Sequence, residues 1–368
     1  MRTYTGFALA CSLLAACGGT NRPLNSEGVV PGLAPDGSEG EATDAGMLSP
    51  DPADSGVTTD AGAPGAGAPD AGVHDAGAPP PAPPAAPAGP SLGGCPMFPA
   101  GNIWNRNISG DPVDARSADY LAFMGADSLR LHPDFGAPEY GEPFVVVSGS
   151  QHSAPVTFTY SNQSDPGPYP FPADLPIQAG ADHHATVLDK ERCLLYETFM
   201  TAHSGSGFSA DSGAVFNLRT GALRPEGWTS ATASGLPVLL GLARYDEAVE
   251  RGEIRHALAF TAGASAHFYV RPATHSSGTS GSWNAPPLGL RVRLRAGYDL
   301  SNMHGTSLVI ARALQRYGMF LIDNANDPFW SLAGGQDPRW PTQDLEQLKS
   351  VPASAFEVVK MGELIPGQ

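Results

Sequence analysis

Titratable and cationic side chains recur at every second position in two stretches of the chain. They are His267, Tyr269 and Arg271 in the first stretch, and Arg291, Arg293 and Arg295 in the second. Successive side chains of a strand point to opposite faces, so each stretch would carry one polar face. A Tyr or His base beside a cation is what a lyase for acidic polysaccharides needs. With His275 in the following loop, these residues form a candidate substrate-binding surface; a solvated, salt-bridged outer face is the alternative.

Carboxylates offer a second chemistry. Glu197 alternates with apolar Leu195 and Phe199, and an apolar environment would raise its pKa and suit it to general acid catalysis. Asp246 or Glu247 would supply the second carboxylate of a glycoside hydrolase. The structural alternatives for Glu197 are a solvated strand face or an ion pair with arginine, and for the other two they are residues that cap or solvate a helix.

The remaining candidates have weaker signals. His256 shares a predicted strand face with apolar residues, as a catalytic base or as a core histidine. Trp104 and Trp228 lie in loop-like segments, where an indole can stack on a sugar ring or fill the core. His132-Pro133-Asp134 and Asp182-His183-His184 resemble partial metal sites without a third ligand placed by spacing. We therefore predict neither a metal nor another cofactor.

Many short, β-rich runs separated by Gly, Pro, Asn or Ser follow residue 143, and strands over 237–242, 266–273 and 319–324 are expected among them. This pattern predicts a mainly β fold, an antiparallel sandwich or jelly roll with a few accessory helices. The clearest helical stripe covers residues 307–317 and ends at Gly318, and shorter helices are expected over 117–124, 244–252 and 344–350.

The first residues predict export and anchoring. Residues 1–16 contain one positive charge and a short apolar run, and Leu14-Ala15-Ala16-Cys17 resembles a bacterial lipoprotein signal with Cys17 as the lipidated residue. Residues 17–92, rich in Gly, Ala, Pro and Asp, are expected to be a disordered linker. Residues 93–368 then form one globular domain. Gly18 after the cysteine implies, by that resemblance, transport to the outer membrane.

The net charge argues against some binding partners, and the number of cysteines predicts one disulfide. The chain has a formal net charge of −16, and an acidic protein is poorly suited to nucleic acid. We expect the protein to contact the membrane only through its lipid anchor. Cys95 and Cys193 are the two cysteines left in the domain, and in an exported protein they are expected to form a disulfide.

Several strings resemble a group of secreted bacterial proteins that are usually left without an assigned activity. They are FPAGNIWN (98–105), LHPDFG (131–136), SDPGPYPFP (164–172), RPEGWTSATASGLPVLLGLARYDE (224–247) and IRHALAFT (254–261). The resemblance implies a single extracytoplasmic domain and names no catalytic residue.

Together these features predict a monomeric, surface-anchored lipoprotein that acts on extracellular polysaccharide. A glycoside hydrolase using Glu197 with Asp246 or Glu247 comes first. A polysaccharide lyase using Tyr269 or His267 with Arg271, and a non-catalytic carbohydrate-binding or adhesion protein, are the alternatives.

Overall fold

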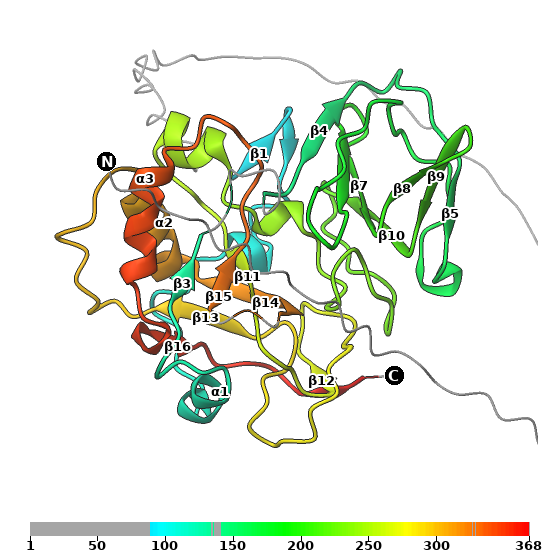
Figure 1. Cartoon of the computed structure of the whole chain (residues 1–368). Helices are drawn as coiled ribbons and strands as arrows, with labels where there is room; N and C mark the ends of the chain where they lie inside the picture. The colour runs from blue at the N-terminus through cyan, green and yellow to red at the C-terminus, as the bar shows by residue number, and fades with distance from the viewer. Residues whose placement is uncertain (1–88, 134, 136–140, 326, 328, 368) are drawn as a thin grey trace, which may run out of the picture. The chain divides into compact units, whose positions relative to one another are not determined.

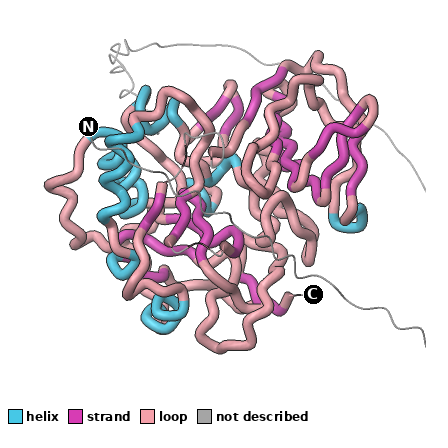
Figure 2. The backbone as a smooth tube through the Cα atoms, viewed as in Figure 1, coloured by secondary structure: helices cyan, strands magenta, loops and turns pink. Residues whose placement is uncertain are grey.

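The computed structural model describes residues 89–367 except 134, 136–140, 326 and 328, and these residues belong to one compact unit (Figure 1). Cys17 and the linker up to residue 88 lie outside the described residues. The described fold is mainly β, as predicted, with strands gathered in several sheets and long loops between them (Figure 2). None of its helices has the length and apolar character needed to cross a bilayer.

The largest sheet has six strands in the order β16-β13-β14-β11-β15-β3. Their bounds are β3 Leu131–His132, β11 Leu258–Ala262, β13 Arg291–Leu294, β14 Met319–Asn324, β15 Trp330–Leu332 and β16 Phe356–Val358. The central pair, β11 and β14, is parallel. Both strands therefore end at the same edge of the sheet, where open α/β sheets commonly bind ligands.

A second sheet has four strands in the order β10-β7-β6-β4, and a third has three in the order β5-β9-β8. Their bounds are β4 Phe144–Val147, β5 Val156–Phe158, β6 Ala185–Asp189, β7 Leu194–Phe199, β8 Ala202–Ser204, β9 Gly207–Ala210 and β10 Ser212–Asn217. Val187 and Leu188 are adjacent on β6, yet Val187 joins a small core with Phe208 of β9 while Leu188 joins the main core. The four-stranded sheet is thus covered on both faces.

The helices and the shorter strand pairs complete the fold. Their bounds are α1 Ser117–Phe123, α2 Gly305–Arg316, α3 Thr342–Leu345, β1 Ser91–Leu92, β2 Cys95–Pro96, β12 Phe268–Tyr269 and β17 Ile365–Pro366. Single turns of 3-10 helix cover Ile103–Asn105, Ser161–Gln163, Leu239–Gly241, Glu346–Ser350 and Ala353–Ala355, and a π-helix covers Asp246–Arg251. Helix α2 buries Ala311 and Leu314 of the expected apolar stripe, together with Ile310, while Leu308 and Val309 are only partly buried.

Three expectations about the strands need correction. Pairing is not antiparallel throughout, because β4–β6, β5–β9, β11–β14 and β15–β3 are parallel. The apolar run 237–242 forms a 3-10 turn rather than a strand, because the Glu197 carboxylate accepts the backbone N–H groups of Val238 and Leu239. The strand expected over 266–273 is only two residues long; Pro272 has no N–H to extend it.

The disulfide between Cys95 and Cys193 is confirmed, with a Cα–Cα distance of 5.4 Å and a sequence separation of 98 residues. Cys193 directly precedes β7 in the four-stranded sheet, and Cys95 begins β2 near the start of the described chain. The bond therefore fixes the entry of the domain to the sheet that carries Glu197.

Candidate functional site

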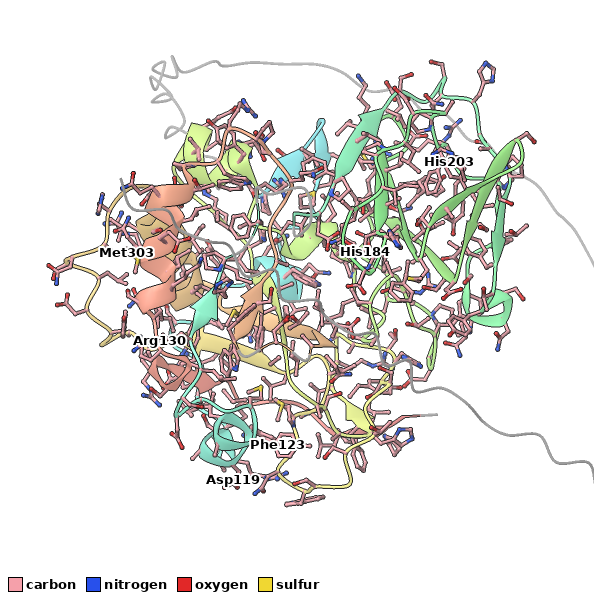
Figure 3. All side chains as sticks on the ribbon, in the orientation of Figure 1. Asp119, Phe123, Arg130, His184, His203 and Met303 are labelled. Carbon is pink, nitrogen blue, oxygen red and sulfur yellow. A yellow bond between two sulfur atoms is a disulfide. The ribbon has the colours of Figure 1, made fainter. Side chains whose placement is uncertain are left out.

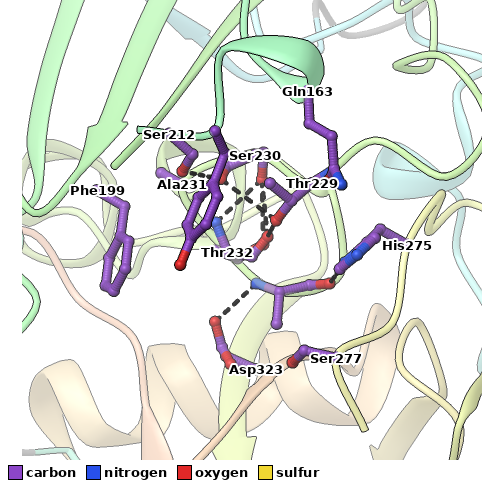
Figure 4. A pocket seen from close by; sticks show the side chains of 12 residues that line it. Gln163, Phe199, Ser212, Thr229, Ser230, Ala231, Thr232, His275, Ser277 and Asp323 are labelled. Atoms are coloured by element: carbon purple, nitrogen blue, oxygen red, sulfur yellow. Dashed lines mark hydrogen bonds between the residues drawn. The ribbon is translucent and has the colours of Figure 1, made fainter. Parts of the chain in front are cut away.

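An open cleft lies where the edges of the four- and six-stranded sheets meet. Its larger half, about 720 Å³, and its smaller half, about 380 Å³, share Phe199, Thr232 and Asp323. Figure 4 shows the smaller half, with these three side chains labelled. Asp323 and Asn324 end β14, and Thr261 lies near the end of the parallel strand β11.

The four-stranded sheet contributes its side of the cleft through matching strand ends. Glu142 and His184 precede the parallel strands β4 and β6, and Phe199 ends β7, which runs antiparallel to β6. All three residues therefore reach the same edge. The backbone of Glu142 also joins the chain beyond β15, donating to the carbonyl of Gly334 and accepting from the N–H of Gln336. Backbone hydrogen bonds therefore connect the two sheets beside the cleft.

Asp323 is the half-buried carboxyl common to both halves of the cleft. Burial raises its pKa to about 6, helped by the charge of Asp182 and opposed by His184 and by N–H groups from Ala233 and Asn324. The Ala233 N–H lies 2.8 Å from Oδ2 and the Asn324 N–H 2.7 Å from Oδ1. Two hydrogen bonds therefore fix the position of the Asp323 carboxyl. Its raised pKa keeps it protonated up to a pH of about 6.

His184 is buried beside Asp323 and faces two acceptors. Its Nδ1 lies 3.0 Å from Oε1 of Glu142, and its Nε2 lies 3.1 Å from the carbonyl oxygen of Ala231. Burial opposes a charge here, but the Glu142 carboxylate outweighs it and raises the pKa of His184 to about 9. Figure 3 shows His184 on the inner side of the four-stranded sheet. The cleft therefore has a fixed imidazolium–carboxylate pair in its wall.

Glu197, the carboxylate predicted to be the catalytic acid, is fully buried, and the backbone N–H groups of Val238 and Leu239 bond both of its oxygens at 2.9 and 2.8 Å. Burial raises its pKa to about 7, against those two bonds and the charge of His184. The residue holds Val238, which lines the cleft, but does not itself line it.

Glu247 and His256 belong to another cluster, which Asp246 joins at its exposed side. Glu247 accepts from His256 at 2.9 Å and from Arg244 at 2.8 Å, and all three side chains are buried. Asp246 pairs with Arg244 and with Arg251. Among the described residues no hydrogen bond or ion pair joins this cluster to Glu197, and the structure does not bring the expected carboxylates together in the cleft. Glu247 thus has two partners inside the protein, while Nη1 of Arg244 is buried with no hydrogen-bond partner among the described residues.

Tyr269 and Arg271 do come together, through a residue that the sequence analysis passed over. Both donate to Glu226, the phenol to Oε1 and the guanidinium to Oε2. Burial raises the pKa of Tyr269 to about 12, with help from the hydrogen bond and charge of Glu226. His267 is exposed elsewhere, near the carbonyl of Gly278, whereas His275 lines the smaller half of the cleft.

The cationic face expected on the stretch with Arg291, Arg293 and Arg295 is not present as predicted, because the first two of these side chains are buried. Arg291 donates to the carbonyls of Tyr317, Ile103 and Arg106, and Arg293 pairs with Glu357. These donors are used inside the protein, which removes both side chains from a sugar-binding surface.

The two tryptophans proposed as sugar platforms have different positions. Trp104 is buried in the main core, 4.8 Å from Phe320 between ring centroids. Trp228 is partly buried beneath the guanidinium of Arg224, and it does not line the cleft.

Sequence reasoning missed Glu142, Gln178 and Asp323 as site residues. One signal was present: a helix directly precedes the strand that ends in Asp323, which is typical of a crossover connection to a parallel strand. Asp182 and His184 were noticed only as a partial metal site. Across the part of the chain that the structure describes, no group of three His, Cys, Asp or Glu side chains is arranged to hold a metal ion. Asp134 lies outside the described residues.

Comparison with known proteins identifies no relative: no family model, no curated protein and no solved structure matches this chain.

Proposed function

We propose that the domain hydrolyses glycosidic bonds of an extracellular polysaccharide, with Asp323 as the general acid. The supporting observation is the position of Asp323, a carboxyl with a pKa raised to about 6 that lines both halves of an open cleft close to the charge of Asp182. Such an acid can protonate the leaving glycosidic oxygen. Asp182, exposed on the wall of the larger half, would be the second carboxylate that activates water or attacks the sugar.

The His184–Glu142 pair has a supporting role in this mechanism. The positive charge of His184 lowers the pKa of Asp323. It therefore stabilises the aspartate formed once the proton has been given to the leaving group. Glu142 fixes that charge in place by accepting from His184 and from the Gln178 amide.

The lyase alternative has less support. A tyrosine base must lose its proton easily, but burial and Glu226 raise the pKa of Tyr269. Arg271, the cation meant for a uronate, pairs with the same glutamate. Tyr269 and Arg271 also lie outside the described lining of the cleft. We therefore prefer a hydrolase to a lyase.

We propose the same cellular setting as the sequence predicts. The chain would be exported, acylated at Cys17, and held at the outer membrane as a monomer with the domain exposed outside the cytoplasm. The linker would give the domain reach toward a bulky polymer. We further propose a sandwich for the four- and three-stranded sheets, on the support of the core that they share.

The test is incubation of the full chain with a polysaccharide panel, following reducing ends and unsaturated-uronate absorbance. We expect reducing ends without absorbance, and a fall in rate of about 10²- to 10⁴-fold in Asp323→Asn. Glu346→Gln, in an exposed ion pair with Lys349, is the matched control and should keep the parent rate. Both signals together would identify a lyase. Binding that survives in Asp323→Asn, without cleavage by the parent, would identify a carbohydrate-binding protein.

A further inference from the structure

The charged residues that line the cleft are mostly acidic. Four acidic residues line it: Glu142, Asp182, Asp323 and Asp327. Among the residues described in its lining there is no Lys or Arg, and the charge of His184 is matched by Glu142. His183 and His275 are the other histidines of the lining. The larger half therefore attracts cations and repels carboxylates.

An unpaired acceptor in the same half provides a second, independent observation. Gln178 is 7% exposed and lines the larger half, and its Oε1 is buried with no hydrogen-bond partner among the residues that the structure describes. The amide orientation is fixed, since Nε2 donates to Oε1 of Glu142 at 3.0 Å and a carboxylate can only accept. The Oδ1 of Asn324, also in this half, is buried and likewise has no partner in the described part of the chain. A buried acceptor left without a donor is costly, so both oxygens favour a ligand that donates.

A protonated primary amine meets both requirements. An ammonium group has three donors, no acceptor and one positive charge. It can donate to the amide oxygens while facing the carboxylate of Asp182, and the protonated Asp323 keeps its role as the general acid. N-acetylation would remove the charge, and a uronate would bring a second negative charge to the acids. A hydroxyl would satisfy one acceptor but gain little from the acids.

The smaller half differs in character. Its lining includes the hydroxyl or amide groups of Tyr160, Gln163, Ser212, Thr229 and Ser277, and Asp323 is its only acid among the described residues. Such groups suit the hydroxyls of a neutral sugar. Asp323 lies at the junction, so a bond protonated there would have one sugar in each half.

We propose that the larger half binds the ammonium group of an unacetylated amino sugar, so that the polysaccharide cleaved is one that carries free amino groups. This inference rests on the proposed hydrolase function and specifies its substrate class. The ring on the other side of the cleaved bond lies in the smaller half and needs no charge.

The test compares three oligosaccharides of equal length and linkage, built from glucosamine, N-acetylglucosamine or glucose. Each is titrated calorimetrically at low salt into the full chain carrying Asp323→Asn. We expect the glucosamine oligomer to bind about 10- to 100-fold more tightly than the other two. Gln178→Met removes the unpaired acceptor with little change in volume and should reduce that preference about tenfold. Gln343→Met, at an exposed position on α3, should leave it unchanged.

The two proposals fail in different ways. Equal or weaker binding of the glucosamine oligomer overturns the amine site, and cleavage of a neutral polymer by the parent would still support the hydrolase. Tight amine binding with no cleavage of any polymer by the parent overturns the hydrolase.

A titration with calcium chloride alone provides a further check. If calcium binds and EDTA abolishes the preference for the glucosamine oligomer, the acids of the cleft hold a metal ion and the amine site is overturned.

Discussion

His184 and Glu142 form a buried ion pair at the edge where β4 and β6 begin, with 3.0 Å between Nδ1 and Oε1. The second ring nitrogen faces the carbonyl of Ala231, so both nitrogens donate when the ring is protonated. Two short parallel strands bring an acid and a base together from positions 42 residues apart in the sequence. The protonation state of His184 therefore depends on the carboxylate of Glu142.

Glu142→Gln should lower the pKa of His184 from about 9 to below its ordinary value, because burial opposes the charge once the carboxylate is gone. A raised histidine pKa stabilises the fold fully below the unfolded value of 6.5, and that contribution is lost as pH rises through about 9. Below pH 6.5 the variant should thus lose about 3 kcal/mol or more. Imidazole chemical shifts followed against pH provide the measurement; a ring that still titrates near 9 would contradict the pairing.

The proposed hydrolase predicts a pH profile. Asp323 must be protonated to act as an acid, so kcat/KM should fall as pH rises through about 6. The charge of Asp182 helps to raise the pKa of Asp323. Asp182→Asn should therefore shift the alkaline limb to lower pH, besides reducing the rate. An unshifted limb would show that another group is the acid.

The sequence predicted local elements better than the site, for a physical reason. Helix α2 and strand β14 follow from their own residue patterns, and the disulfide followed from having two cysteines in a domain that the sequence predicts to be exported. The partners of Glu197 and Arg291 could not be read this way. Both belong to strands, but each bonds to backbone atoms of segments distant in the chain. Alternation indicates which side chains share a face and not whether that face is covered.

Burial of the arginines in β13 predicts unequal effects of similar substitutions. Arg291→Ala leaves several buried carbonyls without donors and should cost about 3 kcal/mol of unfolding free energy. Arg295→Ala is the matched control two residues away. Its side chain is about half exposed, and its loss should cost less than about 1 kcal/mol. Urea unfolding of both variants provides the measurement, and equal losses would mean that Arg291 is not the internal link described.

Removing the disulfide with Cys95→Ala and Cys193→Ala should destabilise the domain, since the bond closes a loop with a sequence separation of 98 residues. In the chain-entropy model the loss is about 4 to 5 kcal/mol. The urea midpoint should fall for the double variant, and a reducing agent should lower that of the parent but not that of the variant. A parent midpoint that is insensitive to reduction would show that the bond does not restrict the unfolded chain.

Glu197 predicts that the domain becomes less stable as pH rises toward 8. Burial raises its pKa to about 7, so the neutral form is favoured in the folded state. For an acid with a raised pKa, the stabilising contribution is complete below the unfolded pKa and is lost as pH rises through the folded pKa.

In Glu197→Gln the group no longer titrates, but one N–H of the turn at Leu239–Gly241 loses its acceptor. The variant should be less stable than the parent near pH 5 by roughly 1–3 kcal/mol. That difference should shrink by about 3 kcal/mol toward pH 8, as the parent pays for burying a charge. Urea unfolding at a series of pH values measures both curves; parallel curves would mean that Glu197 is already ionised in the folded protein at pH 5.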